Sequence, residues 1–207
     1  VHRPVLVTSN LQTKAMINMA HELRPETVPP MVVLRTINDE NAVPGRDFFD
    51  GVNSEGLFDT PCAIARVVRG VSYKRSITVA ASPSMLPTVN EIKWHWVVLQ
   101  GDPAKIKIEE LPVSAPHTMA KITVEFHEPF VVEGSENLLS TRVDIGVIAD
   151  NGHYFSAPAF VSFLYPRNEI RQYSPDNKIL SVDYGAAANK YADPYLTLAR
   201  HWKDVYE

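Results

Sequence analysis

The stretch Ile92-Lys-Trp-His-Trp-Val-Val-Leu-Gln-Gly-Asp102 carries the strongest indication of the fold. Its side chains alternate, so that Trp94 and Trp96 lie on one side of an extended strand and Lys93 and His95 on the other. Two tryptophans on one face of a strand form a large apolar surface, which only a second layer of structure can cover. We therefore predict that this stretch is the central strand of a β-sandwich.

Further candidate strands occur at short and fairly regular intervals around this stretch. Each is short and rich in β-branched or apolar residues, and turn residues separate it from the next. Such spacing is typical of two packed antiparallel sheets. The candidate strands are residues 62–68, 76–81, 92–99, 106–108, 120–126, 142–149 and 157–164.

The composition excludes several classes of protein. The 207 residues are 45% hydrophobic and 21% charged, which is ordinary for a globular protein. A net charge of -4 without a basic run argues against nucleic-acid binding. No apolar run is long enough to span a membrane. The single cysteine, Cys62, cannot form an intrachain disulfide and lies in an apolar strand pattern, where we expect a buried, inert thiol.

The chain divides into three parts. Residues 1–59 form an N-terminal extension and linker, with a strand over residues 4–8, an N-cap at Ser9 or Asn10 and a helix from Leu11 to Leu23. We expect this extension to pack on the sandwich and its polar segment, residues 38–59, to be a solvated loop. Residues 60–166 form the sandwich. Residues 167–207 form a C-terminal extension, in which Asp193-Pro194 predicts the start of a helix.

Three segments stand out together: Ser76-Ile-Thr-Val-Ala-Ala-Ser82, Ile92-Lys-Trp-His-Trp96 followed by Gln100-Gly-Asp102, and Arg142-Val-Asp-Ile-Gly-Val-Ile-Ala-Asp-Asn-Gly152. They resemble the motifs of PKD-type domains, a family of immunoglobulin-like sandwiches. The resemblance covers about half of the chain. It implies a non-catalytic spacer or binding module in a larger bacterial exported protein, secreted or periplasmic, whose partners are other domains of the same parent and polysaccharide or protein. The start at Val1 agrees with a processed product or a piece of a longer protein.

Two groups of residues are candidate binding sites. Trp94 and Trp96 suit the core; if exposed, they would form a sugar-stacking platform with Tyr73 or Tyr154. In the second group, Asp150-Asn-Gly152 suits a tight hairpin turn. The alternative interpretation is that Asp102, Asp150 and Asn151 share one end of the sandwich and hold a structural Ca²⁺ through oxygen ligands.

No catalytic motif supports an enzyme. The seven histidines include no His-Glu-x-x-His pattern, and there is no Gly-x-Ser-x-Gly nucleophile elbow. A hydrolase domain remains the rival hypothesis, with its acid pair in the segment containing Glu128, Glu133 and Glu136 and in the N-terminal loop. A third hypothesis is a structural assembly domain, in which an open sheet edge pairs with a partner strand.

Overall fold

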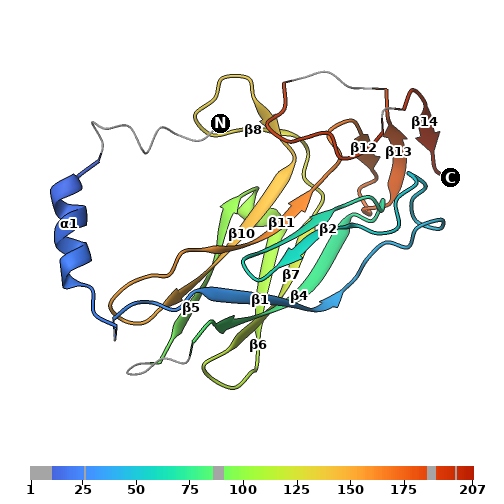
Figure 1. Ribbon diagram of the computed structural model, residues 1–207. Helices are drawn as coiled ribbons and strands as arrows, with labels where there is room; N and C mark the ends of the chain where they lie inside the picture. Colours follow the sequence, from blue (N-terminus) through green and yellow to red (C-terminus); the bar gives the residue numbers. More distant parts are fainter. Residues whose placement is uncertain (1–10, 26, 86–90, 186–189, 199) are drawn as a thin grey trace.

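The computed structural model describes residues 11–25, 27–85, 91–185, 190–198 and 200–207, and these are mainly β-structure. Two sheets make up most of this structure, and smaller sheets lie at one end (Figure 1). The strand predicted over residues 4–8 and its N-cap residues, Ser9 and Asn10, lie outside the described residues. No helix in the described part of the chain is long and apolar enough to cross a membrane.

The first sheet has four antiparallel strands in the order β1-β4-β7-β6. They are β1 (Val32–Asp39), β4 (Lys74–Pro83), β7 (Thr118–Glu125) and β6 (Ile106–Leu111). Burial alternates along β7, as expected for a strand with one face on a core. Because β1 pairs with β4, the sandwich includes a strand that precedes residue 60, where we predicted its start.

The second sheet has five strands in the order β2-β3-β11-β10-β5. They are β2 (Gly56–Thr60), β3 (Ala63–Val67), β11 (Ala159–Leu164), β10 (Arg142–Asp150) and β5 (Lys93–Gln100). The β3–β11 pair is parallel, whereas the prediction was antiparallel throughout. Parallel pairing is possible because β3 and β11 are far apart in sequence and need no hairpin to join them.

The core lies between the inward faces of the two sheets. Ile122 pairs with Ile77 on one side and Ile108 on the other, so apolar side chains form continuous rows across the strands. Across the interface, β10 and β11 contribute an almost completely buried apolar set. Its members are Val143, Ile145, Val147, Ala149, Ala159, Val161 and Phe163.

The stretch that contains the two tryptophans is an edge strand rather than the predicted central strand. Among the described strands, β5 pairs with β10 alone. Trp94 and Trp96 do face the core, where both are half-buried. Their indole Nε1 atoms donate to Pro116 O at 2.9 Å and to Thr118 Oγ1 at 3.2 Å. The rings therefore cover the open side of the core while their polar edges remain hydrogen-bonded.

The N-terminal helix is present but does not pack on the sandwich as predicted. Helix α1 (Thr13–Glu22) follows Gln12 and buries no side chain. Figure 1 shows it standing away from both sheets. The apolar periodicity correctly identified the helix, but it cannot specify which surface covers the apolar stripe.

The helix predicted after Asp193-Pro194 is absent, and the described residues there form an irregular segment followed by strand β14 (Lys203–Val205). The buried Asp193 carboxylate accepts from Thr141 N at 2.7 Å and from Ser140 Oγ at 3.2 Å. It thus holds the chain on hairpin β8 (Phe130–Val131)–β9 (Leu139–Ser140) instead of capping a helix.

The remaining C-terminal strands form a third sheet at one end of the sandwich. It has the order β12 (Ile170–Tyr173)-β13 (Ile179–Asp183)-β14. The guanidinium of Arg171, which is almost fully buried, donates to Val68 O and Gly70 O at 2.8 Å each and docks this sheet on the sandwich. The docking is polar, because the main-chain carbonyls beyond β3 have no strand partner there.

The fold predicts a large difference between two isoleucine truncations. Ile145→Ala leaves a cavity between the sheets and should lower the free energy of unfolding by about 2–5 kcal/mol. Ile37→Ala, on the half-exposed part of β1, should lower it by less than about 1 kcal/mol. Urea unfolding followed by circular dichroism measures both values. Equal losses in the two variants would contradict the placement of the core.

Candidate functional site

Of the aromatic residues predicted as a sugar platform, Tyr73 lies apart from Trp94. Tyr73 precedes β4 and packs edge-on against Tyr173, with ring centroids 5.1 Å apart. Trp94, on β5 of the second sheet, contacts the other end of the first sheet, beside the residues that precede β7. Lys74 at the start of β4 pairs with Glu125 at the end of β7, so the full length of β7 separates Tyr73 from Trp94. Tyr154 follows the β10 turn and is half-buried.

The predicted calcium ligands are also separated, which corrects the hypothesis that they share one end of the sandwich. Gln100, two residues before Asp102, pairs with Asp144, whereas Asp150 pairs with Lys93. Seven residues of strand separate these pairs, or about 23 Å at 3.3 Å per residue. Within the described residues, no group of three or more His, Cys, Asp or Glu side chains is placed to hold a metal ion.

The three residues instead close turns. Asp102 Oδ1 accepts from Ala104 N at 2.9 Å and caps a short 3₁₀ turn, η2 (Pro103–Lys105). Asp150 Oδ1 accepts from Gly152 N at 2.8 Å. Asn151 is buried; its Oδ1 accepts from two main-chain amides of the same turn, and its Nδ2 donates to Thr27 O at 2.8 Å. Asp150-Asn-Gly152 thus lies in a turn, as predicted, but the turn is not a tight hairpin, because Asp150 bridges Phe155 and β11 begins only at Ala159.

His127 is buried and its ring is occupied by structural contacts. Asp102 N donates to Nε2 at 2.9 Å, so this nitrogen has no proton. Nδ1 lies 2.7 Å from Glu125 O and must therefore donate to it. Burial lowers the pKa of His127 and outweighs the hydrogen bonds that favour the charged form. His127 is thus a neutral connector at the edge of a shallow cavity that Glu128 and Phe130 also line.

Cys62 is exposed rather than buried as predicted. It occupies the turn between β2 and β3, and its Sγ lies 3.7 Å from Thr60 Oγ1. The apolar pattern that follows Cys62 belongs to β3, which begins at Ala63, one residue later.

A buried carboxylate, that of Glu55, connects several segments at the end of the sandwich that carries the third sheet. The Glu55 side chain is fully buried, and four donors satisfy its two oxygens. Oε1 accepts from Arg69 N at 2.8 Å and Gly70 N at 2.9 Å. Oε2 accepts from Arg75 Nε at 2.9 Å and Ala42 N at 3.2 Å. One side chain therefore links the 40–55 segment to the chain after β3 and to β4.

The ionic network extends from Arg75 to the edge of both sheets. The Arg75 guanidinium also pairs with Asp39 of β1, and Asp39 Oδ2 accepts from Arg66 Nε of β3 at 2.6 Å. Arg66 in turn binds both oxygens of Asp59 of β2 at 3.0 Å. Burial alone would raise the pKa of Asp39, but the hydrogen bonds from the two guanidinium groups outweigh it and lower the pKa. Residues 38–59 are thus tied down by charge, whereas we predicted a solvated loop.

The segment held by Glu55 forms one wall of a cleft of about 270 Å³, and the third sheet forms the other. We call it the aromatic–arginine cleft. Two neighbouring cavities share lining residues with this cleft. Asp50 and Arg69 line the first cavity as well as the cleft, and Arg46 and Asp47 line the second. The depression therefore continues along this end of the molecule. The cleft is lined by Arg46, Asp47, Phe48, Phe49, Asp50, Arg69, Val71, Ser72, Glu169, Tyr184, Arg200, Trp202, Asp204 and Tyr206.

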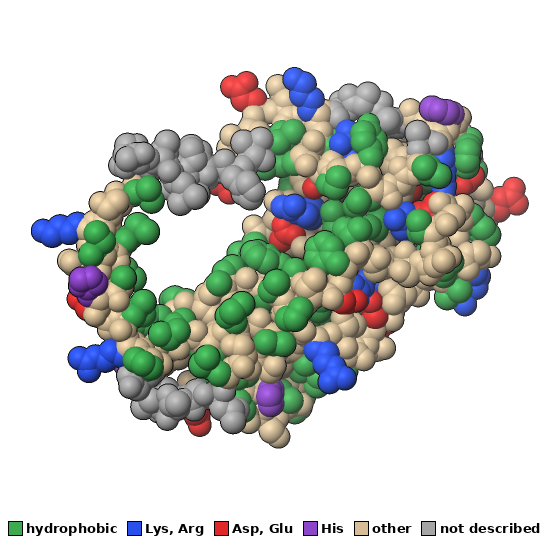
Figure 2. Space-filling view, in the orientation of Figure 1, with side chains coloured by type: hydrophobic (Ala, Val, Ile, Leu, Met, Phe, Trp, Pro, Cys, Tyr) green, Lys and Arg blue, Asp and Glu red, His purple; other side chains and the backbone are tan. Residues whose placement is uncertain are grey.

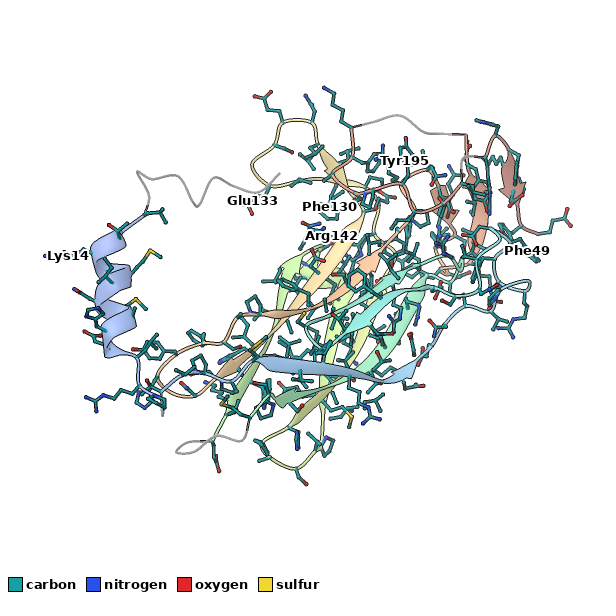
Figure 3. All side chains as sticks on the ribbon, in the orientation of Figure 1. Lys14, Phe49, Phe130, Glu133, Arg142 and Tyr195 are labelled. Atoms are coloured by element: carbon teal, nitrogen blue, oxygen red, sulfur yellow. The ribbon has the colours of Figure 1, made fainter. Side chains whose placement is uncertain are left out.

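Aromatic faces in the cleft are open to solvent. Phe49 is 75% exposed and Trp202 is 55% exposed, although both belong to a lined depression. Figure 3 labels Phe49 on the side of the molecule that carries β12–β14. The Arg200 guanidinium stacks over Tyr184 at 4.9 Å and Trp202 at 5.6 Å from the ring centroids. This stacking places a planar donor group directly beside the exposed aromatic surface.

Five of the charged side chains that line the cleft form ion pairs. Arg46 binds Asp47, Arg69 binds Asp50, and Glu169 binds Arg171. Arg69 Nε is buried without a hydrogen-bond partner among the described residues. The hydrogen bond from Arg46 holds the pKa of Asp47 at about 2, and burial raises the pKa of Tyr206. Near neutral pH the cleft therefore presents the ionised carboxylate of Asp47 and the neutral phenol group of Tyr206.

This site was missed in the sequence because its parts are distant along the chain. Phe49 and Trp202 lie in segments that we predicted as a solvated loop and a helix. No local pattern relates them, since the third sheet and the Glu55 network bring them together. No family model matches this chain, and no curated protein matches it.

The Glu55 network predicts strong sensitivity to a small change. In Glu55→Gln the amide nitrogen must face a main-chain or guanidinium donor, so at least one buried contact becomes repulsive. We expect the free energy of unfolding to fall by about 3 kcal/mol. Glu40→Gln is the control: its Oε1 pairs with Lys121 at the surface, and the loss should be below about 1 kcal/mol. Similar values in chemical denaturation would show that Glu55 is not central.

His127 predicts a pH dependence of stability. Its pKa is lowered in the folded state, so the unfolded chain binds a proton first as the pH falls through about 6.5. Unfolding free energy should therefore decrease between pH 7 and pH 5. His127→Gln keeps an acceptor for Asp102 N but cannot titrate, so its decrease over this range should be smaller. Urea midpoints at several pH values test this, and parallel curves for the two proteins would refute it.

Proposed function

We propose that this chain is a non-catalytic immunoglobulin-like module of an exported bacterial protein that binds carbohydrate in the aromatic–arginine cleft. The strand orders support the immunoglobulin-like part. With β1, β4, β5, β6, β7, β10 and β11 labelled A to G in chain order, one sheet reads A-B-E-D and the other contains G-F-C, the arrangement of constant-type immunoglobulin domains. The PKD-like segments at β4, β5 and β10 occupy strands B, C and F of this scheme.

The observation that carries the binding proposal is the pair of exposed aromatic rings, Phe49 and Trp202, in a cleft lined by paired charges. A sugar ring has apolar C–H faces and a rim of hydroxyl groups. Aromatic faces match the first, and guanidinium and carboxylate groups match the second. The continuation of the cleft into two neighbouring cavities suits a chain of sugar units better than a single compact ligand.

The state of the cleft carboxylates favours binding over hydrolysis. A hydrolase of the kind considered requires a carboxylic acid that is protonated near neutral pH. Asp47, with a pKa of about 2, stays ionised, and Asp50 and Glu169 are held in ion pairs. The rival segment offers Glu128 beside His127, but both His127 nitrogens are already engaged. This hydrolase alternative therefore has less support than the binding module.

A pure spacer and a protein-binding module are the remaining alternatives. Export of the protein, and other domains of a parent protein as its partners, are also part of what we propose. A spacer needs no exposed aromatic cleft, whereas a binding module does. Structural Ca²⁺ at the predicted trio is no longer part of the proposal, because its residues lie at opposite ends of β5 and β10.

Substitution in the cleft provides the test. Thermal-shift scans with soluble β-glucan, xylan, mannan and pectin should find a glycan that raises the melting temperature. Calorimetry with an oligosaccharide of that glycan should then show that Trp202→Ala and Phe49→Ala each weaken binding by at least about tenfold. Phe155→Ala removes a ring outside the cleft whose exposed fraction lies between those of Phe49 and Trp202, and it is the matched control. No shift with any glycan, or equal losses in all three variants, would overturn the proposal.

A further inference from the structure

Helix α1 carries an apolar stripe that the described chain leaves uncovered. Met16, Met19 and Leu23 recur at helical spacing and are all about half-exposed. A ten-residue helix is marginal in water by itself, so its stability depends on burying such a stripe. Lys14 lies on the opposite side of the helix and points away from the sheets in Figure 3. The stripe is therefore turned toward the opening between α1 and the sheets.

The outer face of the second sheet carries a matching apolar patch. Trp94 and Trp96 face the core, so Val97 and Leu99 face outward, and both are exposed. Val97 pairs with Gly146, which pairs with the exposed Phe160, and a Cβ on Gly146 would collide with Leu99. Figure 2 shows hydrophobic side chains bordering the opening on both sides. Val97, Leu99, Phe155 and Phe160 form what we call the outer patch.

The two surfaces agree in length. At 1.5 Å per residue, the ten residues of α1 span about 15 Å. Along β5, the outer patch extends from Phe155, which bridges Asp150 opposite Lys93, to Leu99. Leu99 lies six positions beyond Lys93 along the strand, which corresponds to about 20 Å. One helix therefore suits the patch, as expected for a helix packed on a sheet.

The chain that follows α1 is fixed on the sandwich of the same copy. Arg24 N donates to Thr27 Oγ1 at 3.1 Å, and Thr27 N donates to Arg24 O at 2.9 Å, which closes a turn directly after the helix. The buried Asn151 side chain donates to Thr27 O at 2.8 Å and fixes this turn on the sandwich. Met31 and Ser84 exchange two further hydrogen bonds. These contacts anchor the chain from Arg24 onward, and α1 projects from this anchored base with its stripe accessible to another copy.

We propose that the occupant is a second copy of this chain, with each α1 packed on the outer patch of the other copy. In a dimer with a two-fold axis, each contact between a helix and a patch occurs twice, so both stripes and both patches are covered at once. The polar side of α1, with Lys14, His21 and Glu22, then stays in water. This dimer is independent of the aromatic–arginine cleft, none of whose lining residues belongs to α1 or to the outer patch.

Sedimentation velocity of the full 207-residue chain over a range of concentrations tests the dimer. We expect a monomer–dimer equilibrium that Met19→Asp weakens by at least about tenfold, because it places a charge in the buried stripe. Val97→Lys should weaken it similarly from the sheet side. Lys14→Glu, on the polar side of the helix, should leave it unchanged. Circular dichroism confirms that each variant is folded. A folded wild-type chain that stays monomeric at all concentrations would overturn the proposal.

Cross-linking distinguishes exchange between copies from closure within one copy. In a Cys62→Ser background, one preparation carries Met19→Cys and another carries Phe160→Cys. A bifunctional maleimide added to the mixture should yield a covalent heterodimer. If instead a doubly substituted chain links only within itself and the mixture yields no heterodimer, α1 closes on its own sheet and the proposal is wrong.

Discussion

The end of the molecule that carries the third sheet depends on the contacts that the fully buried carboxylate of Glu55 makes. Removing a carboxylate from water is costly, and the cost is offset here by four donors, one of them the Arg75 guanidinium. The donors come from three separate parts of the chain, namely Ala42, the adjacent amides of Arg69 and Gly70, and the side chain of Arg75, so the carboxylate is satisfied only when all three are in place. The long polar segment between β1 and β2 is thereby fixed against the sandwich.

Fixing that segment also shapes the cleft on its outer side. The residues just before Glu55 carry Phe49 and Asp50, and they face the third sheet across the aromatic–arginine cleft. Arg171 docks the third sheet through main-chain carbonyls next to the amides that bind Glu55. The two walls of the cleft are therefore positioned by one continuous polar network. An exposed ring such as Trp202 is kept at a defined place without being buried.

The sequence predicted what depends on local periodicity and failed where partners are distant. Alternation located the strands and the inward faces of Trp94 and Trp96, because a two-residue period is a local property. It could not show that β5 is an edge strand, since strand order is set by non-local pairing. Asp102 and Asp150 were grouped because both follow strands, although their turns lie at opposite ends. Glu55 lies in the segment that we predicted as a solvated loop, because none of its four donors is close to it in the sequence.

The most direct test of the cleft uses the three tryptophans of the chain as reporters. Trp94 and Trp96 have their indole N–H groups hydrogen-bonded at the core, whereas Trp202 is exposed in the cleft. In a ¹⁵N-labelled protein each indole N–H gives its own signal during a titration with oligosaccharides. The account predicts that the Trp202 signal moves while those of Trp94 and Trp96 stay in place. Movement of the other two signals alone, or no movement with any oligosaccharide, would contradict it.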